Sequence, residues 1–193
     1  MKGMSTMDNM NNVIGEVGFR FSSRFSQLIG RNLISNPIVA VSELVKNSYD
    51  ADADNISVEF SNLLSGVPTL KITDDGDGMT FDDIATKWMM VGTDNKVHNP
   101  LTPKGRRKLG EKGIGRFSVE RLARKLQIIS SKSDDDFAIS LSIDWDQYEN
   151  YEGEFSALTH RVVKLPCDIC HKGTTLILSE LRDEWTESRL LDL

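Results

Sequence analysis

Four oxygen-bearing side chains recur at helical spacing in a segment that otherwise has the apolar pattern of a buried helix. They are Glu43, Asn47, Asp50 and Asp54, and at about 100° per residue they fall within roughly 60° of one another. Hard cations such as Mg²⁺ prefer oxygen ligands, and a carboxylate one turn away can orient a water molecule beside the cation. The stripe therefore suits phosphate chemistry, although a solvated outer face is the alternative interpretation.

The element that positions this stripe is predicted to be a helix from Pro37 to about Asp52. Asn36 is a suitable N-cap, and proline suits the first helical position. No basic residue lies four positions after an acid of the stripe, which argues against a face stabilised by ion pairs. The opposite face of the helix is expected to be buried and consists of Ile38, Val41, Leu44, Val45 and Ser48.

A first glycine cluster, "DDGDGM", follows a predicted strand that ends at Asp74. Gly76 and Gly78 permit backbone shapes and close approaches that other residues forbid. A carboxylate at this position can accept a hydrogen bond from an amino group such as that of adenine. An acidic turn without a ligand is the alternative.

A second cluster, "GEKGIGRFS", places Gly110, Gly113 and Gly115 directly before a predicted helix. Backbone N–H groups at a helix start form an anion site. The segment is neither a Walker A loop nor a full dinucleotide fingerprint. Six basic residues and one acid lie between Lys104 and Arg116; they indicate a solvated loop, a nucleic-acid contact or a lid over triphosphate, and the adjacent glycines favour the lid.

The remaining pattern predicts an α+β fold, a two-layer α/β sandwich with helices on one face of a mixed, mostly antiparallel sheet. Thr80 and Asp83 resemble a capping box, and a long loop is expected over 92–113. Helices are expected over 21–29, 37–52, 81–91 and 116–126, with another beginning in 183–193, and strands over 55–60, 69–74, 126–130, 137–144, 161–165 and 174–181.

Length and charge restrict the class of protein. A chain of 193 residues fits one domain of ordinary size, expected at 17–182, with a flexible terminus at 1–16 and a helix at 183–193 that leads to a following domain. The net charge of −6 argues against a surface devoted to nucleic acid. The start has no secretory signal, and no apolar run approaches the ~20 residues of a membrane span. A cytoplasmic protein is expected.

Four segments in this order, "ELVKNSYDA", "ITDDGDGM", "GEKGIGRFS" and "KGTTLILSEL", resemble the GHKL superfamily of gyrase B, heat-shock chaperone, histidine kinase and MutL ATPases. The resemblance implies the Bergerat fold, with ATP and Mg²⁺ bound beneath a flexible lid. Glu43 would then be the general base, Asn47 the Mg²⁺ ligand, and Asp50 a supporting residue. Asp74 would accept from the adenine amino group, with Thr174 nearby through water. Gly76, Gly78 and Met79 would line the base pocket, and backbone donors to the phosphates would come from Lys112, Gly113, Ile114, Gly115, Arg116 and Phe117.

The resemblance also implies an activity and its alternatives. Residues 19–51 are most similar to bacterial proteins of the chaperone-like and MORC-like branch. We expect an ATPase whose lid closure and ATP-dependent homodimerisation drive a larger protein, and which is slow alone because relatives receive a basic residue from a following domain. A nucleotide-controlled clamp with negligible hydrolysis is the alternative. A histidine-kinase-like phosphotransfer domain is another, disfavoured because such kinases usually carry asparagine where Glu43 stands.

The segment "CDICH" matches a haem attachment pattern and contains two possible zinc ligands. Haem attachment normally requires export, and zinc would need further ligands, for which His160 is a candidate besides His171. Thiols that bind neither group are the alternative for Cys167 and Cys170. The three histidines support no nucleophilic triad.

Overall fold

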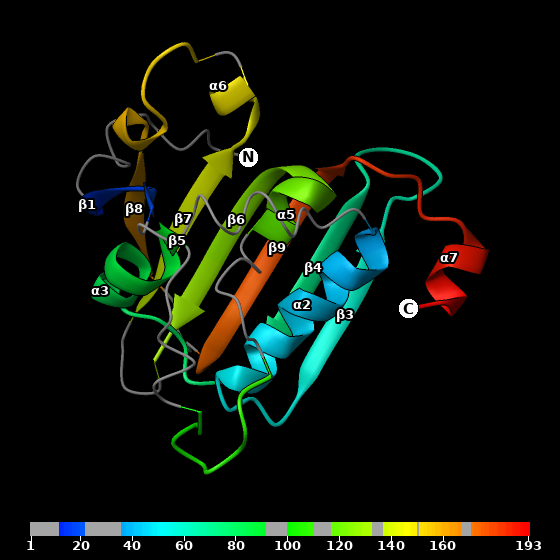
Figure 1. Ribbon diagram of the computed structural model, residues 1–193, viewed down its shortest axis with the longest axis horizontal. Coiled ribbons are helices and arrows are strands. Elements are labelled where there is room, and N and C mark those ends of the chain that lie inside the picture. Colours follow the sequence, from blue (N-terminus) through cyan, green and yellow to red (C-terminus); the bar gives the residue numbers. More distant parts are fainter. Residues whose placement is uncertain are drawn as a thin grey trace.

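The computed structural model describes residues 12–21, 36–91, 100–109, 117–132, 137–149, 151–166 and 171–193. Their main feature is a seven-stranded sheet in the order β1-β8-β7-β6-β9-β4-β3, in which every neighbouring pair is antiparallel. The strands are β1 (Val13–Gly18), β3 (Ile56–Ser61), β4 (Thr69–Asp74), β6 (Ala123–Ser131), β7 (Phe137–Asp144), β8 (Thr159–Pro166) and β9 (Gly173–Leu181). Helices α2 and α5 lie on one face of this sheet (Figure 1), which confirms the predicted α+β architecture.

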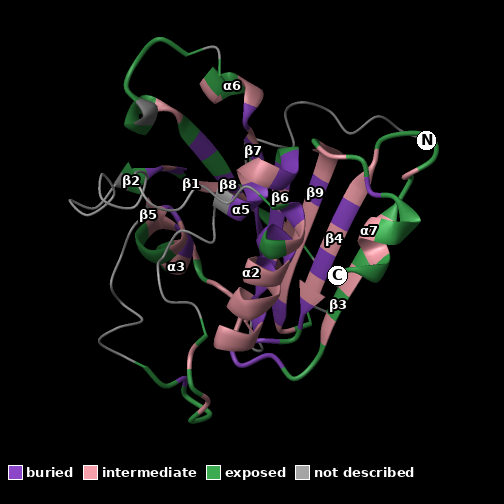
Figure 2. Ribbon diagram, turned by 45° about the vertical axis from the view of Figure 1, so that its right-hand side comes forward, coloured by how far each residue is buried: buried purple, intermediate pink, exposed green. Residues whose placement is uncertain are grey.

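Helix α2 (Pro37–Asp50) begins as the sequence predicts; of the face expected to be buried, Val41, Leu44 and Ser48 are buried, whereas Ile38 and Val45 are half-buried. The Asn36 side chain accepts a hydrogen bond from the Ile38 N–H at 2.8 Å, and proline occupies the first turn. The helix ends two residues earlier than expected, and its buried residues are Pro37, Ala40, Val41, Leu44 and Ser48. Figure 2 shows α2 lying over the sheet, and the oxygen-bearing residues lie on the side of the helix away from these buried residues.

Strands β3 and β4 form the predicted hairpin. Buried and partly exposed residues alternate along β4, and Leu70 and Ile72 are almost fully buried. Asp74 is the last residue of the strand and lies opposite Ile56 on β3 and Thr174 on β9. Side chains alternate between the two faces of a strand, so Asp74 points to the same face as Leu70 and Ile72, toward the layer of helices.

The predicted helix over 116–126 is too long. Helix α5 covers only Phe117–Leu122, and Ala123 begins strand β6 directly. Ala123 pairs with Leu181, and Leu126 pairs with both Leu178 and Ile143. Backbone pairing with two neighbouring strands thus outweighs the helical spacing of the apolar residues.

The predicted helix over 81–91 begins correctly but ends early. Its capping box is present, with the Asp83 N–H donating to Thr80 Oγ1 at 3.1 Å and the Thr80 N–H donating to Asp83 Oδ2 at 3.0 Å. Helix α3 (Phe81–Asp83) continues as one π-helical turn (Ile84–Trp88). The last two residues, Met90–Val91, form strand β5 instead, because they pair in parallel with β2 (Arg20–Phe21).

The two ends of the chain differ in part from expectation. Strand β1 begins at Val13, inside the segment 1–16 expected to be flexible, because it pairs with β8 and closes that edge of the sheet. The helix predicted over 21–29 lies outside the described residues except for Phe21, which belongs to β2. Helices α6 (Asp146–Glu149) and α7 (Glu187–Leu191) are short. Within the described ranges, no helix has the length and apolar character needed to cross a membrane.

The core lies between the sheet and the helices on its covered face. Its largest fully buried side chains include Trp145, Phe19, Leu44, Leu122 and Ile128. The ring centroids of Phe19 and Trp145 are 5.5 Å apart in a stacked arrangement. Phe19, which joins β1 to β2, is therefore held by aromatic packing.

Candidate functional site

Asp74 is the centre of the candidate site, and three elements hold its carboxylate. Oδ2 accepts from the Ser48 hydroxyl at 2.7 Å, and Oδ1 accepts from the N–H groups of Gly76 at 3.0 Å and Thr174 at 3.1 Å. The side chain is only 9% exposed. Burial raises the pKa of Asp74, while the hydrogen bonds from Ser48, Gly76 and Thr174 act in the opposite direction. The carboxylate is thus fixed as a buried acceptor where α2, β4 and β9 meet.

Ser48 is a site residue that the sequence analysis placed only on the buried face of the helix. It is 4% exposed, and a buried hydroxyl needs a hydrogen-bond partner. The serine among apolar residues was a usable signal, since it indicates a polar group across the interface. Its bond to Asp74 joins the helix that carries Glu43 and Asn47 directly to the end of β4.

The glycines after Asp74 are required by close backbone contacts. A Cβ on Gly76 would lie 2.7 Å from the Ala51 carbonyl oxygen, and one on Gly78 would lie 2.1 Å from the Ser131 carbonyl oxygen. Gly78 also has a φ of +64°, in the left-handed region. The turn therefore packs backbone to backbone against the end of α2 and the end of β6.

We expect Gly78→Ala to lower the free energy of unfolding by about 2–5 kcal/mol, because it combines a strained φ with a steric clash. Chemical denaturation measures this change. Gly105→Ala is the matched control: its φ is +79° but nothing lies within 4 Å of a new Cβ, so only the backbone cost of about 1–2 kcal/mol remains. Equal losses for the two variants would contradict the close contact at Gly78.

Met79, predicted to line the base pocket, and Thr174, predicted to act nearby through water, meet at Ser130. The Met79 N–H donates to Ser130 Oγ at 2.8 Å, and Ser130 Oγ lies 2.9 Å from Thr174 Oγ1. Asp74, Thr174 and Ser130 lie opposite one another on the neighbouring strands β4, β9 and β6. The sequence analysis did not identify Ser130, because this register is set by strands far apart in the chain.

Three of the four residues of the oxygen-bearing stripe lie on α2. Glu43 Oε1 is 2.8 Å from Lys46 Nζ, and the Glu43 side chain is 27% exposed. Asn47 is half-buried, and Asp50 Oδ1 accepts from the Leu109 N–H at 2.8 Å. A basic partner therefore exists three residues after Glu43, although none exists four residues after it. A carboxylate and an amide oxygen remain one turn apart on this face.

Asp54 is not part of the stripe, because α2 ends at Asp50. It lies in the following turn, where Lys104 Nζ is 2.8 Å from its Oδ2 and Arg106 donates to its Oδ1. The Lys104 N–H also donates to Asp52 Oδ2 at 3.0 Å. Burial would raise the pKa of Asp52, but hydrogen bonds from Thr102 and Lys104 and the charge of Arg106 hold it below its ordinary value. These two basic residues therefore anchor their loop to acids rather than presenting charge to a triphosphate.

Part of the predicted site cannot be placed. Lys112, Gly113, Ile114, Gly115 and Arg116 lie outside the described residues, and Phe117 is described only as the first residue of α5. Cys167 and Cys170 also lie outside them.

His160, the further candidate zinc ligand, is 6% exposed. Its Nε2 is 2.5 Å from the Tyr148 hydroxyl, so this histidine has a protein partner.

The described residues contain no group of three or more His, Cys, Asp or Glu side chains placed to hold a metal ion. A nucleotide-bound Mg²⁺ does not require such a cage, because one or two protein oxygens complete a shell made largely of phosphate and water oxygens. The amide oxygen of Asn47 and the carboxylate of Glu43 are donors of that kind. The oxygen-bearing face of α2 therefore fits a metal that arrives with a nucleotide.

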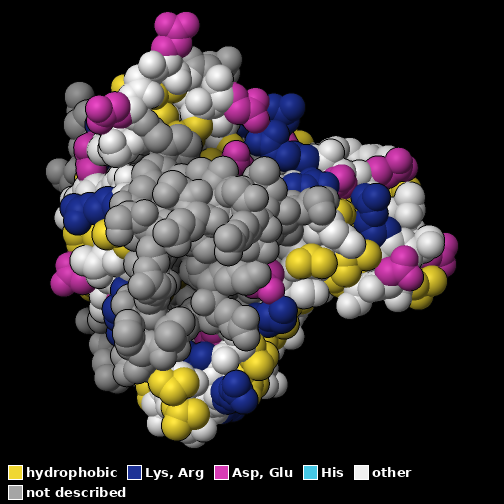
Figure 3. All heavy atoms as spheres, in the orientation of Figure 1, with side chains coloured by type: hydrophobic (Ala, Val, Ile, Leu, Met, Phe, Trp, Pro, Cys, Tyr) yellow, Lys and Arg dark blue, Asp and Glu magenta, His cyan; other side chains and the backbone are white. Residues whose placement is uncertain are grey.

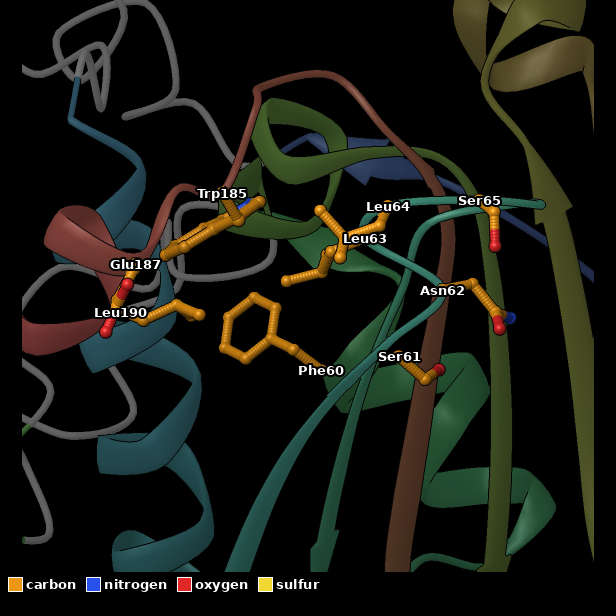
Figure 4. A pocket seen from close by; sticks show the side chains of 9 residues that line it. All are labelled: Phe60, Ser61, Asn62, Leu63, Leu64, Ser65, Trp185, Glu187 and Leu190. Carbon is orange, nitrogen blue, oxygen red and sulfur yellow. The ribbon is translucent and has the colours of Figure 1, made fainter.

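A separate hollow of about 470 Å³ lies at the other end of the β3–β4 hairpin. The side chains of Phe60, Leu63, Trp185 and Leu190 point into it from β3, the following loop and the C-terminal segment (Figure 4). None of the predicted nucleotide-site residues lines it.

On the described surface seen in Figure 3, basic and acidic side chains are interspersed, which agrees with the modest net charge of −6.

An antiparallel sheet covered by helices, with a buried aspartate and a glycine turn at the end of a strand, defines a domain of the GHKL ATPase class. Residues 34–174, well over half of the chain, match the family model described as histidine kinase-, DNA gyrase B-, and HSP90-like ATPase. The chain belongs to this family, and the fold is the Bergerat fold. The resemblance inferred from the four motifs is thereby confirmed at the level of the superfamily.

Two kinds of curated relatives are similar to the chain. The DNA mismatch repair protein MutL of Clostridium beijerinckii is 28% identical over 156 residues, covering 81% of this chain and 21% of that protein. MutL of Thermodesulfovibrio yellowstonii is 31% identical over 104 residues, with 54% and 18% covered. A putative type II restriction enzyme, HgiDII of Herpetosiphon aurantiacus, is 28% identical over 121 residues, with 62% and 19% covered. The matched region spans about a fifth of each relative's length.

Proposed function

We propose that this chain is a Mg²⁺-dependent module that binds ATP and hydrolyses it to ADP and phosphate. The observation that carries the proposal is the hydrogen bond between Ser48 and Asp74. It places the buried acceptor at the end of β4 directly beneath the helix whose other face carries Glu43 and Asn47. A base-recognising group and a phosphate-directed group are thus supported by one helix.

Asp74 is the group that recognises the base. Its carboxylate is aligned by three protein donors, and one of the roughly four lone-pair sites of a carboxylate, on Oδ2, is left to accept a further hydrogen bond. The exocyclic amino group of adenine supplies the matching donor. Thr174 contributes nearby through water, and Gly76, Gly78 and Met79 form the wall of the base pocket because their backbone can approach the ligand closely.

Glu43 and Asn47 act on the phosphate side. The Asn47 amide oxygen would hold Mg²⁺, which supplies charge neutralisation for the phosphate oxygens when bound. Glu43 is the general base that takes a proton from the attacking water. Its ion pair with Lys46 holds the Glu43 side chain on this face of α2, and Asp50 supports the site by fixing the loop through the Leu109 N–H.

Backbone N–H groups of residues 112–117, which end at the first residue of α5, would donate hydrogen bonds to the phosphates. In a larger protein, closure of the lid predicted between Lys104 and Arg116, together with ATP-dependent homodimerisation, would couple nucleotide state to other domains. Turnover by the 193-residue chain alone is expected to be slow if a following domain supplies the basic residue for the γ-phosphate. The boundary expected between residues 16 and 17 lies inside β1 (Val13–Gly18), whereas the role of 183–193 as the lead into a following domain remains a prediction. The MORC-like branch, a bacterial source and a cytoplasmic location also remain predictions.

A nucleotide-controlled clamp with negligible hydrolysis is the second candidate. The close pair between Glu43 and Lys46 favours it, because the Glu43 carboxylate is then directed at the ammonium group and not at a water molecule. The two functions share the ATP site and differ only in turnover. Histidine-kinase-like phosphotransfer remains the weaker alternative, because position 43 is a glutamate.

Isothermal titration with a non-hydrolysable ATP analogue, with Mg²⁺ and with a chelator, tests the shared part of both candidates. We expect saturable binding at one site per chain, tighter with Mg²⁺ because the metal would bridge the phosphates and Asn47. Asn47→Ala should remove most of the difference between the two conditions. Absence of binding by the unaltered protein would overturn the proposal.

A further inference from the structure

Ser130 is a buried hydroxyl at the end of β6 with three protein partners. It is 1% exposed. Its Oγ lies 2.8 Å from the Met79 N, 3.0 Å from the Gly173 carbonyl oxygen and 2.9 Å from Thr174 Oγ1. These partners come from the glycine turn after β4 and from the start of β9, so one side chain joins two segments far apart in the sequence.

The chemistry of these groups determines where the hydrogens lie. A hydroxyl has one hydrogen to donate and two lone pairs that accept. The backbone N–H of Met79 can only donate and the carbonyl of Gly173 can only accept, so Ser130 accepts from the first and donates to the second. Its second lone pair is then satisfied only if the Thr174 hydroxyl donates to it.

This arrangement orients Thr174 as well as holding it. With its hydrogen directed at Ser130, the Thr174 hydroxyl presents only lone pairs to any other partner. The adjacent Asp74 carboxylate is also an acceptor, and it lies opposite Thr174 on the neighbouring strand. The polar edge made by these two residues therefore accepts hydrogen bonds and favours a ligand or ordered water that donates them.

We propose that Ser130 is a positioning residue for recognition of the base. It touches no ligand itself, since it is almost completely buried. It fixes the Met79 backbone at one wall of the pocket and the direction of the Thr174 hydroxyl at another. The inference rests on the proposed ATP site and adds a residue that determines its preference among bases.

The neighbouring serine provides a matched control. Ser131 is also buried, at 4% exposure, and within the described ranges its hydroxyl bonds only to the Lys132 carbonyl, at 3.2 Å. Its side chain points to the opposite face of the sheet from that of Ser130, because successive residues of a strand alternate. Ser131→Ala therefore removes a buried hydroxyl from the same strand without disturbing Met79 or Thr174.

The test compares Ser130→Ala and Ser131→Ala for binding of a non-hydrolysable ATP analogue and of its inosine counterpart, which differs at the purine 6 position. We expect Ser130→Ala to weaken binding of the ATP analogue by about tenfold, because two donors in the pocket wall lose their acceptor. Binding of the inosine analogue should change much less, so the ratio between the affinities for the ATP analogue and the inosine analogue becomes smaller. Ser131→Ala should leave the preference unchanged. If Ser130→Ala does not fold, Ser130→Cys carries the same test, because the thiol keeps the volume but hydrogen-bonds weakly.

The outcomes separate this inference from the proposed function. An unaltered protein that binds neither analogue would overturn both. Normal binding by the unaltered protein with an unchanged preference in the Ser130 variants would overturn the positioning role alone. Equal weakening for the two analogues would also overturn it, because a purely structural role predicts that result.

Discussion

Asp74→Asn is expected to weaken binding of an ATP analogue by roughly 100-fold while the domain remains folded. The amide oxygen can still accept from the Gly76 and Thr174 N–H groups, and the Ser48 hydroxyl can turn to accept from the new amide nitrogen. The acceptor offered to the ligand is replaced in part by a donor, which would oppose the adenine amino group. Binding is measured by isothermal titration, and folding by thermal denaturation without ligand.

Asp75→Asn is the matched control for this experiment. The Asp75 carboxylate accepts from the N–H groups of Asp54 and Asn55 and from the Asn55 side chain, all within 2.8 Å. These bonds, led by that from the Asn55 N–H, lower the pKa of Asp75 to about 2. The control should therefore change stability but not affinity. Equal loss of affinity in both variants would show that Asp74 acts through the turn rather than through the ligand.

Glu43→Gln is expected to reduce the rate of ATP hydrolysis by roughly 10²–10⁴-fold with little change in affinity for the ATP analogue, because an amide cannot accept the proton of the attacking water. Glutamine keeps the size and hydrogen-bonding reach of glutamate, so the geometry of α2 should be preserved. Phosphate release under single-turnover conditions measures the chemical step even when turnover is slow. Hydrolysis is the property that separates the ATPase from the clamp.

Glu59→Gln provides the control for removal of a carboxylate. Glu59 lies on β3, its side chain is 57% exposed, and it is 3.7 Å from Lys71. This variant should hydrolyse ATP at the unaltered rate. If Glu43→Gln were equally active, Glu43 would not be the base. If the unaltered protein binds ATP but releases no phosphate even with its natural neighbouring domains, the clamp is the better description.

Features that depend on near neighbours in the chain were predicted well from the sequence. The Asn36 cap and Pro37 mark the start of α2, the alternation along β4 places Asp74 at the end of a buried strand, and Thr80 opens the next helix. The order of the four motifs was sufficient to identify the superfamily. Backbone propensity, side-chain period and capping act within a few residues, so a single sequence contains the information needed.

Where local patterns compete, the tertiary structure decided the outcome. Ala123 and Leu126 have helical spacing with the residues before them, yet they belong to β6, because β9 pairs with both residues and β7 also pairs with Leu126. The helical spacing extends the stripe to Asp54, but α2 ends at Asp50. Asp54 therefore forms ion pairs with Lys104 and Arg106 instead. In each case partners distant in the sequence contribute more than the local periodicity.

The supporting residues of the candidate site also required the structure. Ser48 and Ser130 look like ordinary serines of a helix and a strand. Packing of α2 on the sheet brings Ser48 to Asp74, and strand register brings Ser130 to Thr174. Asp74 and Thr174 are 100 residues apart in the chain, and no local rule specifies that they share a hydrogen bond. The sequence alone determined the family through its four motifs, and it predicted which residues would bind a nucleotide. Tertiary packing decided which buried hydroxyls orient them, because a buried polar group takes its partner from whatever element lies against it.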